Sequence, residues 1–235
     1  MKSVRMAFLL AFIILFSSCK DIIFNNPLDP EASKGEVIVL KVLNTNFPGE
    51  GELAFDGEKL WKIYGSGRLV AFDRETGGKI RELFIPSSKG LVFLDDYLYL
   101  SSSENYLTIV NPLSGDFISN LLTGEKYFEF ITKTGDKIIG YDKKSSRFFL
   151  FDPESGESEE LFKLTGFNIG GVSIYQGFLI ITEKNSASIY LFNTNGKVEK
   201  VYSSPISDIS GISVDENSYI YLASSDGKIY KITLP

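Results

Sequence analysis

The sequence predicts an all-β fold, a five-bladed β-propeller built from four-stranded antiparallel blades. Three observations lead to this prediction. Short apolar segments recur with a period of about 40 residues, the aromatic residues are 19 Phe and 12 Tyr against one Trp, and the two ends of the repeating region complement each other. Phe and Tyr favour pleated strands. A six-bladed or incomplete ring and a β-sandwich, whose strands are similarly spaced, are the alternative architectures.

The clearest marker of the repeat is an apolar strand that ends in Asp or Asn and precedes a turn with Gly. These positions step by 38, 41 and 41 residues, at Asp73, Asn111, Asp152 and Asn193. A related strand, 228–233, ends the chain. With the apolar segments around each marker, every repeat contains four short strands, which is the content of one propeller blade. The predicted blades are approximately 51–88, 89–127, 128–168, 169–208, and 209–235 together with 36–43.

The ends of the repeating region predict how the ring closes. The last repeat stops after its third strand, at Pro235, whereas an unassigned strand at 36–43 precedes the first repeat. If this early strand is the missing outer strand of the last blade, the two ends of the chain seal the ring and leave no edge to aggregate. We therefore expect the N-terminal strand to close the propeller.

The N-terminus is typical of a targeting signal. Basic residues, an apolar run at 6–16 and small residues before a cleavage site are the parts of a secretory signal peptide. The apolar run is too short to span a membrane. Cys19 is the only cysteine. The small residues before it resemble the lipobox of bacterial lipoproteins, although Phe16 stands where that pattern usually has an aliphatic residue. An ordinary signal peptide and an uncleaved anchor are the alternatives. The predicted organisation is a signal peptide at 1–18, a lipidated Cys19 with a tether at 19–34, and a β-propeller domain at 35–235.

Composition excludes several classes of function. The chain has 24 basic and 30 acidic residues and a formal charge of -6, which argues against a nucleic-acid partner because phosphate binding needs clustered Lys and Arg. It has no histidine, so the commonest general base and metal ligand are missing. A single cysteine forms no disulfide within the chain. Because no nucleotide, hydrolase or zinc motif is present, we assign no catalytic residue, metal ligand or cofactor.

Two parts of the repeat resemble known propeller families. The last repeat, 209–230, resembles blades of the NHL and SMP-30-like superfamily. The turn with Asp73, Thr76, Gly77 and Gly78 resembles a pyrroloquinoline-quinone-type (quinoprotein-like) repeat, but no blade has the Trp that follows the glycine in those repeats. The resemblance implies a propeller and says little about activity. We interpret the Asp and Asn turns as self-capping turns rather than calcium loops, because they recur in successive blades.

Candidate binding residues come from two sets of positions. The predicted starts of the innermost strands, which face the channel, offer Glu52, Glu129 and Ser210. The loops between the second and third strands are polar and share one face of the ring, where a rigid scaffold could present them to a ligand. Plain solubility explains the same polarity equally well. The candidate binding-loop residues are Glu104, Asn105, Tyr106, Asp142, Lys143, Glu183, Asn185 and Asp226.

The leading functional hypothesis is a non-enzymatic, membrane-anchored lipoprotein of the bacterial cell envelope whose propeller serves as a scaffold that binds a protein, polymer or other ligand. The alternatives are a lactonase, lyase or glycosidase that uses channel carboxylates and a divalent cation, and a small-ligand sensor. Three acidic side chains converging on the channel would favour the enzyme. The predicted partners are the membrane, through the lipid anchor, and an envelope component. The sequence leaves the membrane, its face and the oligomeric state open.

Overall fold

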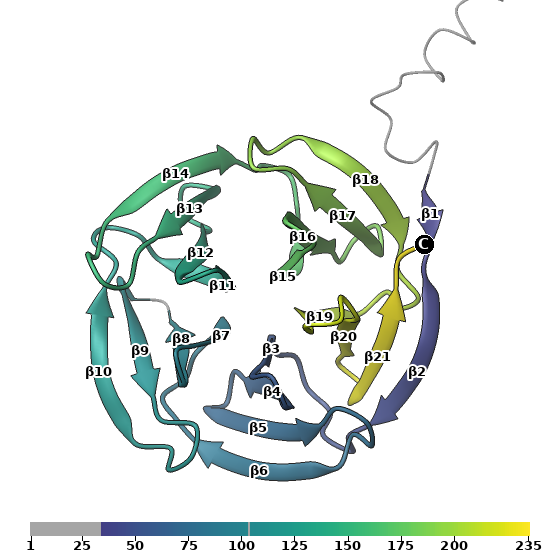
Figure 1. The fold of residues 1–235 in the computed structure, drawn as a ribbon, viewed down its shortest axis with the longest axis horizontal. Coiled ribbons are helices and arrows are strands. Elements are labelled where there is room, and N and C mark those ends of the chain that lie inside the picture. The colour runs from purple at the N-terminus through teal and green to yellow at the C-terminus, as the bar shows by residue number, and fades with distance from the viewer. Residues whose placement is uncertain (1–33, 103) are drawn as a thin grey trace, which may run out of the picture. The chain divides into compact units, whose positions relative to one another are not determined.

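The structure is a computed structural model that describes residues 34–102 and 104–235. Within this part of the chain, twenty-one strands form five sheets that are arranged as the blades of a ring (Figure 1). The prediction of a five-bladed β-propeller with four-stranded antiparallel blades is therefore confirmed. The signal peptide, Cys19 and the tether up to residue 33 lie outside the described residues and stay predictions.

The blades follow one another in chain order, and each runs from an inner to an outer strand. Blade 1 contains β3 (Leu53–Phe55), β4 (Lys59–Tyr64), β5 (Arg68–Asp73) and β6 (Lys79–Phe84). Blade 2 contains β7 (Leu91–Leu94), β8 (Tyr97–Ser101), β9 (Tyr106–Val110) and β10 (Phe117–Leu122). Blade 3 contains β11 (Phe128–Thr134), β12 (Lys137–Asp142), β13 (Arg147–Phe151) and β14 (Ser158–Lys163). Blade 4 contains β15 (Ile169–Tyr175), β16 (Phe178–Glu183), β17 (Ser188–Phe192) and β18 (Val198–Ser203). Blade 5 contains β19 (Ile209–Val214), β20 (Ile220–Ser224), β21 (Lys228–Thr233) and β2 (Ile38–Asn44).

Ring closure follows the predicted scheme with one difference at its start. The outer strand of blade 5 is β2, which pairs antiparallel with β21 from Ile38 opposite Thr233 to Asn44 opposite Lys228. The predicted strand began two residues earlier. Of those two residues, Glu36 belongs instead to β1 (Gly35–Glu36), which pairs in parallel with β18 of blade 4, and Val37 lies between the two strands. Because β21 stops at Thr233, residues before Ile38 have no partner left in blade 5, and the neighbouring blade supplies one.

The core lies between the blades rather than within them. Five clusters of buried apolar side chains are found in the described residues, and each cluster joins two neighbouring blades. Leu43 of β2 belongs to the cluster between blades 5 and 1. Burial of apolar surface is the main favourable term in folding, so the packing of blade against blade holds the ring together. In the part of the chain that the structure describes, no helix is long and apolar enough to cross a membrane.

The marker turns of the repeat are self-capping, as expected. Asp73 Oδ1 accepts hydrogen bonds from the backbone N–H groups of Glu75, at 3.0 Å, and Thr76, at 2.7 Å. Gly77 has a φ of 74°, a left-handed conformation that costs glycine little. The side chains of Asn111, Asp152 and Asn193 accept equivalent bonds in their own turns. These carboxylate and amide groups therefore stabilise the fold.

Candidate functional site

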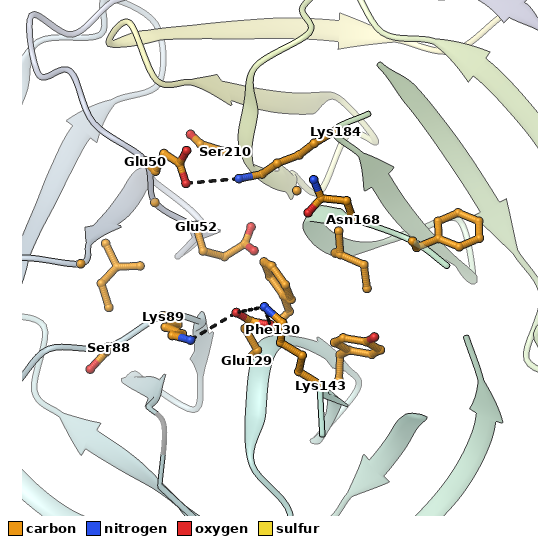
Figure 2. A pocket seen from close by; sticks show the side chains of 17 residues that line it. Glu50, Glu52, Ser88, Lys89, Glu129, Phe130, Lys143, Asn168, Lys184 and Ser210 are labelled. Atoms are coloured by element: carbon orange, nitrogen blue, oxygen red, sulfur yellow. Dashed lines mark hydrogen bonds and ion pairs between the residues drawn. The ribbon is translucent and has the colours of Figure 1, made fainter. Parts of the chain in front are cut away.

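A cavity of about 380 Å³ opens at the end of the ring where the innermost strands begin. All five blades contribute to its lining, which we call the channel pocket. Its residues come from the starts of the inner strands and from the loops after the second strands. Glu52, Glu129 and Ser210, which the sequence predicts to face the channel, all line this pocket (Figure 2). The first strands of neighbouring blades converge here because the ring is closed.

Three lysines and two glutamates form ion pairs at the mouth of the channel pocket. Glu129 lies 3.3 Å from Lys89 Nζ and 3.0 Å from Lys143 Nζ, so one carboxylate links blades 2 and 3 (Figure 2). Glu50 pairs with Lys184 Nζ at 3.2 Å and links blades 1 and 4. These lysines are partly or largely exposed, and exposed ion pairs contribute little to stability. Their ammonium groups are therefore free to exchange an internal partner for a ligand.

Glu52 is the one pocket carboxyl that is fully buried. Its side chain sits at the floor of the channel pocket and is 2% exposed. Oε1 accepts a hydrogen bond from the backbone N–H of Ile212, at 2.9 Å, and another from that of Leu53, at 3.3 Å. Oε2 has no hydrogen-bond partner among the described residues. Glu52 therefore presents one satisfied oxygen to the protein and one unsatisfied oxygen at the pocket.

Burial sets the charge of Glu52. Removal from water raises the pKa of Glu52 from its ordinary value of 4.5 to about 8, and the backbone N–H groups of Ile212, Leu53 and Val172 together with the charge of Lys184 offset this rise only in part. Burial favours the neutral form of a carboxyl because a charge is poorly solvated inside a protein. Near neutral pH, Glu52 is therefore a carboxylic acid with one O–H to donate.

Two glycines allow the Glu52 carboxyl to occupy this position. A Cβ at residue 171 would lie 2.9 Å from Glu52 Oε1, and a Cβ at residue 211 would lie 2.9 Å from Glu52 Cα. Contacts this short force neighbouring atoms to move. Gly171 on β15 and Gly211 on β19 are therefore glycines because the inner strands of blades 4 and 5 approach the start of blade 1 so closely.

An apolar wall faces the charged part of the pocket. Phe130 and Tyr141 of blade 3 and Phe167, just before β15 of blade 4, line the cavity together with Ile169. The rings of Phe130 and Tyr141 are 6.4 Å apart between centroids, and that of Phe167 packs edge-on against Tyr190 at 5.0 Å. Packed in these tilted and edge-on pairs, the aromatic side chains give the pocket an apolar surface beside its cations.

Of the candidate loop residues, only Lys143 lines the channel pocket. Asp142 and Glu183 are buried and cap their own turns, through Ser145 Oγ at 2.7 Å and the Ser186 N–H at 2.6 Å respectively. The remaining five candidates do not line the pocket. Asn185 accepts a hydrogen bond from Asn168 Nδ2, Asn105 donates one to Gly124 O, Asp226 pairs with Lys228, Tyr106 is a half-buried residue of β9, and Glu104 is exposed.

Several pocket residues escaped the sequence analysis. Lys184 is one of them, although it occupies the same place in blade 4 as the candidate Lys143 in blade 3, directly after the last residue of the second strand. That equivalence is visible in the repeat and could have singled out Lys184. The signal for Lys89, Asn168 and the aromatic wall is weaker, because only the curvature of the ring brings them together.

Within residues 34–102 and 104–235, no group of three His, Cys, Asp or Glu side chains is placed to hold a metal ion. Glu129 and Glu50 are engaged by lysines, and Glu52 is buried beneath them. The convergence of three carboxylates, which would favour a divalent-cation enzyme, is therefore not found in this part of the chain.

The raised pKa of Glu52 predicts an unusual dependence of stability on pH. Because the folded state binds this proton more tightly than the unfolded state, the free energy of unfolding should fall as pH rises from about 4.5 to 8, by on the order of 1 kcal/mol per pH unit. The chain has no histidine that would titrate in this range. Burial also lowers the pKa of Lys62 to about 8, which acts above that pH and with the opposite sign.

Urea denaturation of Glu52→Gln between pH 5 and 8 checks this expectation. The variant should lose most of the decline in stability, whereas Glu159→Gln on the exposed face of β14 should follow the wild-type curve. A wild-type stability that is flat or rises over this range would contradict a neutral Glu52.

Comparison with known proteins bears on the fold. No family model and no curated protein matches the chain, so the resemblance to NHL and quinoprotein-like repeats stays a prediction. Among solved structures, the chain is similar to glutaminyl cyclase from Myxococcus xanthus, with a TM-score of 0.70 and 13% identity over 84% of this chain and 96% of that one. BamB from Moraxella catarrhalis gives a TM-score of 0.47 with 17% identity, over 79% of this chain and 59% of the BamB chain. The likeness to the first structure supports the five-bladed propeller fold.

Proposed function

We propose that this protein is a lipid-anchored binding module of the bacterial cell envelope, whose propeller binds its ligand at the channel pocket. The observation that carries the proposal is the channel pocket itself, a concave site that all five blades line. Its volume of about 380 Å³ lies within the range of small-molecule and peptide-end sites, and its mixture of an apolar wall and a few polar groups is typical of them.

The anchor in this proposal rests on the sequence. Cys19 is the single cysteine and follows small residues at the end of a secretory signal. The propeller begins at Gly35, so about fifteen residues, rich in Asn and Pro, connect the lipid to the ring. A chain of this length spans at most about 50 Å when extended. The anchor would therefore hold the propeller within reach of partners in the same membrane.

Exposed apolar side chains on the outer strands support a protein partner. They lie on β2, β6 and β10, which belong to three consecutive blades, 5, 1 and 2. The residues are Ile38, Val39, Leu40, Val42, Ile80, Phe84, Phe117, Ile118 and Leu122. Large apolar side chains exposed on neighbouring outer strands are a feature of protein contact surfaces.

An enzyme is the second candidate function, and Glu52 is the observation that favours it. A carboxyl with a strongly raised pKa in a cleft is a candidate general acid. The similar solved structure described as a glutaminyl cyclase shows that a propeller of this shape can carry an enzyme. No second group with a matching role contacts Glu52 among the described residues, and we therefore place binding first.

Replacing Cys19 with Ala tests the anchor. Without the sulfur that accepts the acyl chain, the exported protein should move from the membrane fraction to the soluble fraction, because the apolar run at 6–16 is too short to span the bilayer. Immunoblots of fractionated cells measure this shift, with wild-type protein as the reference. Unchanged membrane partitioning of the variant would refute lipid anchoring at Cys19.

A photo-crosslinking amino acid in place of Lys143 tests binding at the channel pocket. Lys143 is largely exposed and lines the pocket, so its replacement should fold normally and should capture the ligand in living cells. The matched control carries the same group in place of Lys163, an exposed residue of outer strand β14. Mass spectrometry should find an adduct at position 143 and none at 163. Equal labelling at both positions, or no adduct at 143, would contradict the proposal.

A further inference from the structure

One polar atom of the channel pocket lacks a partner. Three buried side-chain atoms in the described residues have no hydrogen-bond partner, and of these only Glu52 Oε2 belongs to a residue that lines the pocket. Figure 2 shows the Glu52 carboxyl pointing into the middle of the pocket. Buried polar groups in native proteins are almost always hydrogen-bonded, and an exception calls for an explanation.

We propose that Glu52 Oε2 donates a hydrogen bond to the carboxylate of a bound ligand, and that the ligand carries this carboxylate on an apolar body. The proposal rests on the proposed function of the channel pocket as a binding site. It adds the chemical class of the ligand and the residue that selects it. A free organic acid and the C-terminus of a polypeptide share this chemistry.

The surroundings of Glu52 make it a donor. The backbone N–H groups of Ile212 and Leu53 both bond to Oε1, so Oε2 is the oxygen left to hold the proton. Glu183 shows the contrast. Burial would raise the pKa of Glu183 too, but hydrogen bonds from Ser186, Asn185 and Asn168 outweigh burial and lower it. Glu183 is thus an ionised turn cap, whereas Glu52 has an O–H that no protein group among the described residues accepts.

The charges around the pocket favour an anionic ligand. With Glu52 neutral, the mouth holds three lysines, Lys89, Lys143 and Lys184, against two carboxylates, Glu50 and Glu129. A ligand carboxylate would balance the remaining positive charge. Its hydrogen bond from Glu52 would be charge-assisted, and such bonds are shorter and stronger than neutral ones. The wall formed by Phe130, Tyr141 and Phe167 would cover the apolar body.

Few other ionisable groups face Glu52. The strands packed against it, β3, β15 and β19, contain no Asp, Glu, Lys or Arg. Lys184 and the lysines and glutamates of the mouth are the charges above it. Lys62 on β4 directs its Nζ to the carbonyl oxygens of Gly49, at 2.7 Å, and Ser224, at 3.2 Å. Because Lys62 also titrates near pH 8, a variant at position 52 is needed to isolate the effect of Glu52.

Calorimetric titration of the full-length, detergent-solubilised protein tests the proposal. The probes are N-acetyl-phenylalanine and its uncharged amide, and the protein is titrated at pH 7 and pH 8.5 in buffers of different ionisation enthalpy. Wild-type protein should bind the acid at least ten-fold more tightly than the amide. At pH 8.5 its binding should weaken and take up a fraction of a proton, because the ligand anion favours protonated Glu52. Glu52→Gln keeps an N–H donor without a titrating group, so it should bind with no proton uptake.

Other outcomes would overturn the inference. Equal binding of the acid and the amide, or no binding of the acid at millimolar concentration, would refute a carboxylate ligand. Proton uptake in Glu52→Gln equal to that of the wild type would refute Glu52 as the contact. In either case an adduct at position 143 in cells would leave the binding function standing, whereas its absence would refute that function separately. The mass of the adduct distinguishes a small acid from a polypeptide end.

Discussion

The antiparallel pairing of β2 with β21 joins the first and last parts of the propeller, and the channel pocket depends on this closure. Closure places the inner strand of blade 5 beside the start of blade 1, where Gly211 comes close to the Glu52 backbone and Ile212 donates to the Glu52 carboxyl. Glu52 and Ile212 are 160 residues apart in sequence. In an open ring, Glu52 would face water as an ordinary ionised carboxylate.

Close approach of the inner strands gives the pocket two layers with different chemistry. At the mouth, lysines and glutamates pair across blades while they remain partly solvated. These ion pairs therefore add little stability, and their main effect is on the charge of the pocket mouth. At the floor, Glu52 is withdrawn from water and raised in pKa to about 8, so a carboxyl acts as a neutral donor. The same type of side chain therefore has opposite roles at two depths of one channel, and burial decides between them.

The repeat and its closure could be predicted from the sequence because the strand period and the complementary ends can be read directly from the order of apolar segments along the chain. The channel position of Glu52, Glu129 and Ser210 followed from the same period. The roles of the loop residues could not be predicted from this period. Asp142 and Lys143 are neighbours in sequence, yet one caps a turn and the other lines the pocket. The protonation state of Glu52 could not be predicted from the sequence either. It depends on burial by the inner strands of two distant blades, whose glycines and backbone N–H groups surround the carboxyl.

A carbon-13 NMR titration of the Glu52 side-chain carboxyl in the full-length protein tests the central claim most directly. The signal is assigned by its loss in Glu52→Gln. If Glu52 is buried and neutral at the pocket floor, its carboxyl should titrate with a midpoint near 8. A midpoint near 4.5, the ordinary value for Glu, would show that the carboxyl is ionised at neutral pH and would contradict the account of the channel pocket.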